Sequence, residues 1–236
     1  MTSDAPATDG SASRRRRRLP PFTEVVVAVV AVALVQAFLV KPFGVPSQSM
    51  EQTLHIGDRI AVNRLDHSIA GGDVVVFGHG TTWQTPRLPP DPNLFKRTVR
   101  FVGDLTGIGP SNTAYTVKRV IGLPGRTVAC CSTDGKVTVD GEPLDEPYVF
   151  EDLPFTPGVL DCDSTPRSTR CFPEITVPAD TYLVMGDHRS QSADSVIGCR
   201  GSAAGPECAR LVPAERLIGP VVLRFWPLGD IGPLAR

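Results

Sequence analysis

Two serines and a distant lysine are the residues of this sequence with the clearest capacity for chemistry. Ser47 and Ser49 are separated by one residue in the segment PSQSM, and Lys118 lies in an apolar stretch beside Val117 and Val120. A serine hydroxyl becomes a good nucleophile when a neighbouring base takes its proton. Burial lowers the pKa of a lysine amine enough for this task, whereas an arginine stays charged. Because only four of the 24 basic residues are lysine, a lysine inside an apolar strand is a candidate general base.

A third segment, Gly186–Ser195, is densely polar although it follows an apolar stretch directly. It consists of GDHRSQSADS and contains hydroxyls, carboxylates and an arginine. Such a segment can orient a catalytic base through hydrogen bonds and ion pairs. Each of the three segments also has a structural interpretation. The serines can belong to an ordinary turn, Lys118 can be a surface lysine whose stem covers apolar neighbours, and the polar run can be a hydrogen-bonded turn.

The first forty residues differ in composition from the rest of the chain. Residues 1–21 are small and polar and contain the arginine run Arg14–Arg18, so we expect a disordered tail. Residues 22–40 are almost wholly apolar, and as a helix they would span roughly 28 Å, close to the thickness of a bilayer core. We therefore predict a transmembrane signal anchor that leaves the arginines in the cytoplasm and residues 41–236 outside the plasma membrane. The alternatives are a cleavable signal peptide, which has a shorter apolar core, and a buried core helix, which the adjacent arginines disfavour.

All six cysteines follow the apolar segment, in the part of the chain that we expect in an oxidising compartment. Cys162 and Cys171 flank one short polar loop, and Cys199 and Cys208 flank another, so we predict a local disulfide across each loop. The adjacent pair Cys130-Cys131 can form a vicinal disulfide, pair elsewhere or stay reduced. The chain has no CxxC motif and its four histidines are scattered, so we expect neither a metal site nor a cofactor.

Residues 41–236 consist of short β-branched segments that are separated by turn residues. No long helical periodicity follows Val40, which predicts a mainly β domain of twisted antiparallel or barrel-like sheets behind one N-terminal transmembrane helix. Segments near 78–113 and 151–174 are rich in turn residues and are expected to be inserted loops. Examples of the predicted strands are Arg59–Asn63, Asp73–Phe77, Tyr115–Ile121, Val137–Val139, Thr181–Met185 and Ile218–Phe225.

Four blocks of the sequence follow the apolar segment in a specific order. They are PSQSMEQTLHIGD, GDVVVF, VKRVIGLPGRT and GDHRSQSADS. This combination resembles the bacterial type I signal peptidase family, the membrane-bound Ser–Lys proteases that release secreted proteins from their signal peptides. The many arginines, the adjacent cysteines and the arginine-rich tail resemble an actinobacterial member of that family.

The resemblance implies a catalytic mechanism. Ser49 would be the nucleophile, and Lys118, made neutral by burial, would take its proton and later activate the deacylating water. The Ser49 backbone N–H and the Ser47 hydroxyl would form the oxyanion hole. Ser192 would hydrogen-bond the Lys118 amine and orient it.

The same resemblance implies a supporting set of charged residues. Asp187, Arg189 and Asp194 would support the catalytic loop, with Arg119 as an ionic partner. The family pattern usually ends in Asp-Ser-Arg, whereas this chain has Val196 after its last serine. We therefore expect Asp194 to pair with Arg119 or Arg189 instead.

The resemblance also implies the substrates and partners. The family cleaves secretory preproteins after small residues at positions −1 and −3, commonly Ala-X-Ala, because shallow apolar pockets exclude larger side chains. Besides preproteins we expect the lipid bilayer as a partner and a monomeric chain. The net charge of −1 argues against a broad nucleic-acid-binding surface. The residues that match the pocket-forming stretch are Phe43, Val45, Pro46, Met50, Leu54 and Val117.

Three other functions are compatible with parts of the sequence. A Ser-His-Asp hydrolase would use Ser49, His55 and Asp58, but these residues lie in one short turn-rich segment without a G-x-S-x-G motif. A sortase-like enzyme would need a single reactive cysteine, whereas six structural cysteines are expected. The non-enzymatic alternative is a membrane-tethered β module that binds a partner in the cell envelope.

Overall fold

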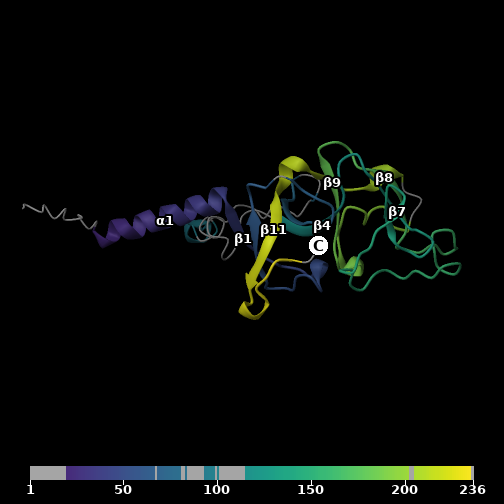
Figure 1. Ribbon diagram of the computed structural model, residues 1–236, viewed down its shortest axis with the longest axis horizontal. Coiled ribbons are helices and arrows are strands. Elements are labelled where there is room, and N and C mark those ends of the chain that lie inside the picture. Colours follow the sequence, from purple (N-terminus) through teal and green to yellow (C-terminus); the bar gives the residue numbers. More distant parts are fainter. Residues whose placement is uncertain are drawn as a thin grey trace, which may run out of the picture.

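A helix leads into a body made of antiparallel sheets. The structure is a computed structural model, in which helix α1 (Pro21–Phe38) extends away from the sheets (Figure 1). The mainly β prediction is confirmed. The predicted disordered tail and most of the predicted loop near 78–113 lie outside the described residues. The structure describes residues 20–66, 68–80, 83, 93–98, 100, 115–201 and 205–234.

Helix α1 carries exposed apolar side chains on all sides. Its exposed valines include positions 25, 26, 27, 29, 30 and 32, and successive residues of a helix are rotated by about 100°, so these valines surround the axis. The helix ends at Phe38 because Val40 already pairs with Asn63 in the first strand. Within the described part of the chain, no helix combines the length and the apolarity needed to span a membrane, so the transmembrane helix predicted over 22–40 is not found.

The larger sheet has seven strands and is open, with β1 and β10 at its edges. Strand β3 shows why its centre is buried on both faces. Val74 and Val76 belong to one apolar cluster, whereas Val75 and Phe77 belong to another, because successive side chains point to opposite faces. In spatial order the strands are β1 (Val40–Gly44), β2 (Arg59–Asn63), β11 (Leu217–Trp226), β3 (Val74–Gly78), β4 (Tyr115–Gly122), β9 (Thr181–Met185) and β10 (Val212–Pro213).

Strand β11 joins the two halves of this sheet. Its first part, around Gly219, pairs with β3, and its second part, from Val221 onward, pairs with β2. Gly219 has a φ of 149°, and a Cβ at this position would lie 1.9 Å from the carbonyl oxygen of Asn63. Only glycine allows the two backbones to approach this closely.

The smaller sheet has four strands and shares a hydrophobic core with the larger one. Leu183 of β9 and Ile121 of β4 pack in one buried cluster with Val128 and Ile175 of the smaller sheet. The sheets are therefore held together by common apolar burial. The strands of the smaller sheet, in spatial order, are β7 (Glu142–Pro143), β6 (Val137–Val139), β5 (Thr127–Cys130) and β8 (Phe172–Thr176).

The strands predicted from sequence are all present. Arg59–Asn63, Val137–Val139 and Thr181–Met185 have the predicted bounds, and the other three differ by one residue at one or both ends. Short 3₁₀ turns connect the strands, and two of them carry site residues. These turns are η1 (Gln48–Met50), η2 (Arg189–Gln191), η3 (Pro206–Cys208), η4 (Ala214–Arg216) and η5 (Leu228–Asp230).

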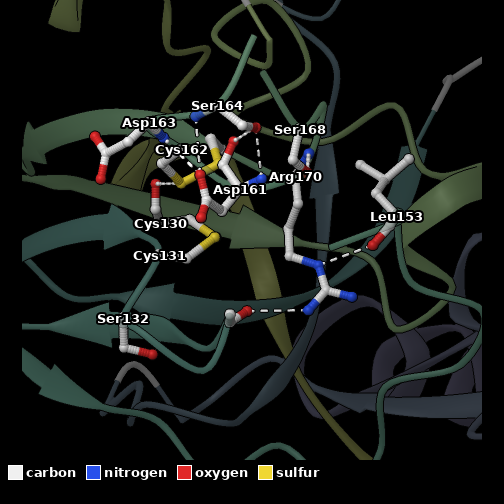
Figure 2. The surroundings of a disulfide bond; sticks show 12 residues. Cys130, Cys131, Ser132, Leu153, Asp161, Cys162, Asp163, Ser164, Ser168 and Arg170 are labelled. Carbon is white, nitrogen blue, oxygen red and sulfur yellow. Dashed lines mark hydrogen bonds between the residues drawn. A yellow bond between two sulfur atoms is a disulfide. The ribbon is translucent and has the colours of Figure 1, made fainter. Parts of the chain in front are cut away.

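All six cysteines form disulfides. The predicted pairs Cys162–Cys171 and Cys199–Cys208 are confirmed, and Cys130–Cys131 takes the vicinal form among the three alternatives. Two of these bonds lie next to each other (Figure 2), with Cys162 Sγ 3.6 Å from the carbonyl oxygen of Cys130. The loop closed by Cys162–Cys171 is ordered further by Asp161, whose carboxylate accepts the backbone N–H groups at positions 163 and 164. Two disulfides and these hydrogen bonds therefore hold together the end of the smaller sheet next to β5 and β8.

Candidate active site

Ser49 lies in turn η1, at the boundary between solvent and the apolar core. Met50 and Leu54, on the same segment, are buried in the cluster that contains Phe43, and they anchor the turn. The exposed fraction of Ser49 is 6%, whereas Ser47 is exposed. The Ser47 and Ser49 hydroxyl oxygens lie 3.4 Å apart. The two serines of the motif therefore share one small region of the surface.

Lys118 lies in the middle of strand β4, between β3 and β9. Only 2% of the residue is exposed, and Val75 lies opposite it on β3. Burial lowers the pKa of the Lys118 amine from 10.5 to about 8, and the carboxylates of Asp194 and Asp187 oppose this shift. The amine is therefore available as a base close to neutral pH, as the sequence predicts.

The strand register brings Lys118 to the point where β9 ends. Arg119 of β4 pairs with Met185, the last residue of β9, so the same register places Gly186 opposite Lys118. Opposing residues of antiparallel strands project to the same face of a sheet. The Lys118 side chain therefore points to the face that a side chain at Gly186 would occupy.

Two of the predicted site residues, Ser49 and Ser192, meet at Gly186. A Cβ at this position would lie 2.3 Å from Ser192 Oγ and 2.4 Å from the carbonyl oxygen of Ser49. The backbone N–H of His188 donates to the same carbonyl oxygen at 3.2 Å. Ser49 and Ser192, from segments far apart in the sequence, therefore meet at Gly186, and the strand register directs the Lys118 side chain to the same face of the sheet.

Ser192 is buried, but its hydroxyl does not make the predicted hydrogen bond to Lys118. Among the described protein atoms, Ser192 Oγ has no hydrogen-bond partner. The hydroxyl packs against Gly186 instead, in the space that the missing side chain leaves. The serine is thus at the site, while the predicted hydrogen bond is absent from this structure.

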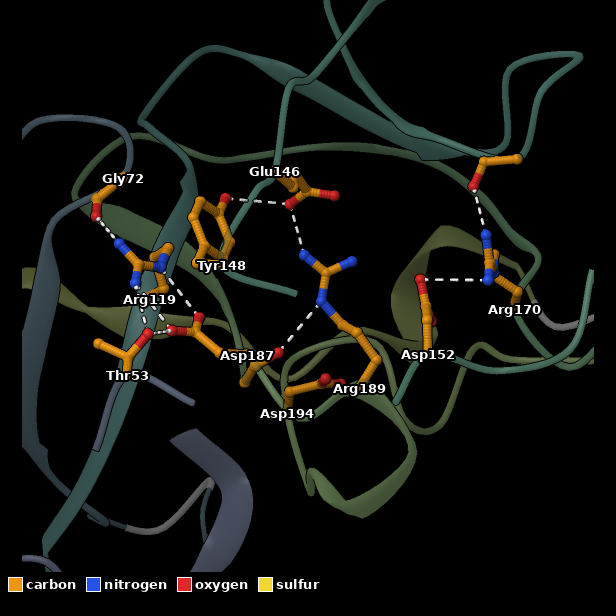
Figure 3. Close-up of polar contacts among 12 residues, drawn as sticks. Thr53, Gly72, Arg119, Glu146, Tyr148, Asp152, Arg170, Asp187, Arg189 and Asp194 are labelled. Atoms are coloured by element: carbon orange, nitrogen blue, oxygen red, sulfur yellow. Dashed lines mark hydrogen bonds and ion pairs between the residues drawn. The ribbon is translucent and has the colours of Figure 1, made fainter. Parts of the chain in front are cut away.

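Arg119 and Asp187 form a buried, bidentate ion pair beside the site (Figure 3). The guanidinium donates to both carboxylate oxygens, at 2.9 and 2.7 Å, and to the carbonyl oxygen of Gly72 at 2.7 Å. Thr53, three residues after Met50, donates to Asp187 at 2.5 Å. The guanidinium also stacks on the ring of Tyr148, 3.8 Å from its centre. Arg119 is therefore an ionic partner, as predicted, and it fixes β4 relative to the loop after β9.

The prediction that Asp194 pairs with Arg119 or Arg189 is wrong. Arg119 binds Asp187, as described above, and Arg189 is held by Glu146 and by the carbonyl oxygen of residue 186. Asp194, which is fully buried, instead accepts a hydrogen bond from Arg200 Nη2 at 2.8 Å. Each arginine thus has its own carboxylate, and the arrangement avoids an unpaired buried charge.

Val196 does not take part in this ion pairing. Its side chain is fully buried in the core shared by the two sheets, and its backbone N–H donates to Asp194 Oδ1 at 3.2 Å. The role expected for an arginine directly after Ser195 is therefore filled from outside the motif, by Arg200.

A second set of contacts, centred on His188, links turn η1 to the loop after β9. The buried ring of His188 lies between two carboxylates, with Nδ1 3.4 Å from Glu51 and Nε2 3.2 Å from Glu151. The side chain of His188 also packs edge-on against Phe150, whose backbone N–H donates to the carbonyl oxygen of Asp187. Glu51 directly follows η1, so this cluster connects Ser49 to the loop after β9.

The predicted substrate-pocket residues fall into two groups. Five of them belong to one buried apolar cluster next to η1, and Pro46 is exposed outside it. The cluster forms an apolar support beneath Ser49. The five buried residues are Phe43, Val45, Met50, Leu54 and Val117.

The arrangement needed for a Ser-His-Asp triad is not present. Asp58 accepts the backbone N–H of His55 at 2.9 Å, and its carboxylate lies 3.5 Å from Arg224. His55 itself is exposed. The Asp58 carboxylate is therefore engaged by a backbone group and an arginine, and it does not orient an imidazole toward Ser49.

Sequence reasoning missed several residues that support the site. Thr53 and Gly186 lie inside the sequence blocks that resemble the family, so their short distance in sequence from predicted site residues could have identified them. Glu146, Tyr148 and Arg200 lie outside those blocks. Nothing in their local sequence distinguishes them from surface residues, because their roles depend on contacts across the fold.

Comparison with known proteins assigns the family. The sequence model of the family described as "Signal peptidase, peptidase S26" matches residues 20–226. The chain belongs to this family. It is 34% identical to a "Probable signal peptidase I" of Mycobacterium leprae, across 91% of this chain and 79% of the relative. It is also 34% identical to the "Signal peptidase I" of Mycobacterium tuberculosis (strain CDC 1551 / Oshkosh), across 95% of this chain and 78% of the relative.

More distant members of the signal peptidase S26 family are similar over comparable lengths. The "Signal peptidase I" of Leptolyngbya laminosa is 30% identical across 98% of this chain and 94% of the relative. A crystal structure of a signal peptidase I from Enterococcus faecalis V583 matches 65% of this chain and 96% of that chain, at 20% identity and a TM-score of 0.34. The two mycobacterial relatives agree with the actinobacterial resemblance of the sequence.

Proposed function

We propose that this chain is a signal peptidase I, an endopeptidase that removes N-terminal signal peptides from secreted preproteins. The meeting of Ser49 and Ser192 at Gly186, with the buried Lys118 directed to the same face of the sheet, carries the proposal. Ser49 is the proposed nucleophile, and Lys118 is the proposed base, whose pKa suits proton transfer near neutral pH. Membership of the signal peptidase family and the names of the relatives support the same activity.

The proposed mechanism uses only groups of this chain. Ser49 Oγ attacks the carbonyl carbon of the scissile bond while the neutral Lys118 amine takes the hydroxyl proton. The Ser49 backbone N–H and the Ser47 hydroxyl donate to the resulting oxyanion. The C–N bond then breaks, and the leaving amine receives the proton from the Lys118 ammonium. Finally Lys118 deprotonates a water molecule, which hydrolyses the ester on Ser49.

We propose that the apolar support beneath Ser49 sets the preference for small residues. Phe43, Met50 and Val117 pack together beside the nucleophile, and we propose that they leave only a shallow pocket for the substrate. An alanine at position −1 or −3 fits this pocket, whereas a larger side chain clashes. An extended substrate can add as a strand beside the segments that carry Ser49 and Lys118, with backbone hydrogen bonds to hold it. An Ala-X-Ala cleavage site has small residues at both positions and can bind in an extended conformation.

We also propose that the N-terminal apolar segment, residues 22–40, anchors the protein to the plasma membrane. A helix that is apolar on all sides and exposed outside the protein body needs an apolar environment. The run Arg14–Arg18 favours a cytoplasmic N-terminus, which leaves the sheets on the outer side of the membrane. We propose that the chain is a monomer there. Carbonate extraction of cell membranes, with protease treatment of intact spheroplasts, tests this arrangement. Release of the full chain by carbonate, or protection of residues 41–236 from the protease, would contradict it.

Cleavage of a preprotein by the purified protein tests the proposed activity. The full chain in detergent should cut a preprotein at an Ala-X-Ala site, and the cut should persist in a metal chelator. Ser49→Ala and Lys118→Ala should each abolish cleavage while the circular dichroism spectrum stays unchanged. His55→Ala is the matched control and should retain activity. Full activity of Lys118→Ala would remove the Ser–Lys mechanism, and a folded wild-type chain without any cleavage would favour the binding module.

A further inference from the structure

The partner of Asp194 decides how its charge acts on the general base. Asp194 is fully buried, and burial raises its pKa above the ordinary value, although the positive charges of Arg200, Lys118 and Arg189 partly offset this effect. Asp194 in turn raises the pKa of the Lys118 amine, as does Asp187. Asp187 is neutralised by its bidentate pair with Arg119 described above. Asp194 therefore needs a counter-charge other than Lys118 if Lys118 is to lose its proton.

Arg200 supplies that counter-charge. Its Nη2 donates to Asp194 Oδ2 at 2.8 Å, and its Nη1 donates to the carbonyl oxygen of Arg189 at 2.9 Å. The guanidinium of Arg189 is already held by Glu146. Arg200 is thus the arginine whose guanidinium pairs with Asp194, and it also fixes turn η2, which leads into Ser192.

A covalent bond holds Arg200 in position. Arg200 directly follows Cys199, whose side chain is fully buried in the shared core and bonded to Cys208. The backbone N–H of Cys199 donates to Val196, so the chain between Asp194 and Arg200 is a closed turn. The position of the guanidinium therefore depends on the Cys199–Cys208 bond as well as on the ion pair.

We propose that Arg200 is a positioning residue of the peptidase site and that the Cys199–Cys208 disulfide holds it there. The arginine neutralises Asp194 and fixes the turn before Ser192, so that the Lys118 amine stays free to accept the proton of Ser49. Without Arg200, Lys118 would be the main cation left to balance the buried Asp194 carboxylate, and the carboxylate would favour the ammonium form of Lys118. The effect on cleavage rests on the proposed function, whereas the effect on the titration of Lys118 does not.

Substitution of Arg200 tests the ion pair. In Arg200→Met, the apparent pKa of the acid limb of the kcat/KM profile should shift to higher pH by about one unit. At pH 7 this shift corresponds to about tenfold lower kcat/KM. Arg200→Lys keeps the charge and should restore part of the loss, because a single ammonium reaches Asp194 but cannot hold the Arg189 carbonyl in the same geometry. The matched control is Arg216→Met, which removes an exposed arginine near Glu215 and should leave the profile unchanged. An unshifted profile in Arg200→Met would overturn the proposal.

A titration of Lys118 separates this inference from the peptidase activity. The chain has four lysines, so ¹³C-labelled lysine gives few side-chain signals, and Lys118→Met identifies the one that belongs to position 118. The Lys118 signal should titrate at a higher pH in Arg200→Met than in the wild type. This result would support the inference even if no preprotein were cut. The same midpoint in both proteins would contradict it, whatever the cleavage assay shows.

A pair of disulfide variants tests the tether. Cys199→Ala/Cys208→Ala and Cys162→Ala/Cys171→Ala each remove a bond with a sequence separation of 9, so the two lose similar chain entropy. The first variant should show the shifted pH profile and a lower kcat/KM. The second should be destabilised to a similar degree but keep the wild-type profile. Equal losses of activity in both variants, or a wild-type profile in the first, would show that the Cys199–Cys208 bond contributes only stability.

Discussion

At the scale of single residues, Lys118 combines a function with a cost in stability. Its amine is nearly fully buried, and burial lowers its pKa from 10.5 to about 8. In the unfolded chain the amine is fully hydrated and returns to its ordinary pKa. Folding therefore disfavours the charged form, and this cost makes the amine useful as a base.

Replacing Lys118 with methionine should stabilise the protein while abolishing cleavage. Between pH 8 and pH 10.5 the unfolded state binds more protons at this residue than the folded state does. The free-energy penalty for burying the Lys118 ammonium is therefore largest below pH 8 and declines as the pH rises. One pKa unit corresponds to about 1.4 kcal/mol, so Lys118→Met should raise the free energy of unfolding by roughly 3 kcal/mol at pH 7. Urea unfolding at pH 7 and pH 10 measures the difference. A destabilised variant at pH 7, or a gain that grows with pH, would contradict the buried-amine interpretation.

At the scale of elements, the site is an intersection of β4, β9 and η1. The register of β4 and β9 sets Lys118 opposite Gly186, and the carbonyl of Ser49 packs where a side chain at 186 would lie. The Arg119–Asp187 pair fixes the strand relative to the loop after β9. The site geometry therefore depends on the absence of a side chain at one position as well as on the groups present.

Gly186→Ala should inactivate the enzyme without unfolding it. The new methyl group would lie 2.4 Å from the Ser49 carbonyl oxygen, which is backbone and cannot rotate away. Moving η1 by about 1 Å should lower kcat/KM by about 100-fold. Gly229→Ala is the control, since a Cβ there meets nothing within 4 Å. Kinetics and circular dichroism of both variants measure the effect, and near-normal kcat/KM in Gly186→Ala would show that η1 tolerates displacement.

At the scale of the whole molecule, a shared core makes the two sheets one cooperative unit. Leu183 and Ile121 of the larger sheet are buried together with Val128 and Ile175 of the smaller one. The disulfides close the loops around this core. The candidate site lies in the larger sheet, but Glu146 and Arg200, which support it, lie close in sequence to Leu144 and Cys199, which pack in the core shared with the smaller sheet.

Leu183→Ala should weaken both sheets together. Leu183 is fully buried, so its truncation leaves a cavity and should cost about 2–5 kcal/mol. Tryptophan fluorescence and far-ultraviolet circular dichroism should report a single, coincident unfolding transition in urea. Leu228→Ala, at a largely exposed position, should change stability by less than about 0.5 kcal/mol. Two separated transitions would show that the sheets unfold independently.

The sequence by itself determined the features that depend on local pattern. The bounds of β2, β6 and β9, the disulfides across the two short loops, and the three segments with catalytic residue types were all predictable. A strand period, a short covalent loop and a polar run each arise within a few neighbouring residues. For the same reason Lys118 stands out, because a lysine in an apolar strand is unusual wherever that strand lies.

Only the tertiary structure decided which distant groups meet. Sequence could not place β11 between β2 and β3, assign Arg200 to Asp194 and Glu146 to Arg189, or show that Ser192 Oγ packs against Gly186 without a hydrogen-bond partner. Every buried charge must find a counter-charge, but several arginines satisfy that requirement equally well in the sequence. The choice is made by strand register and by the covalent turn at Cys199, which exist only once the chain has folded.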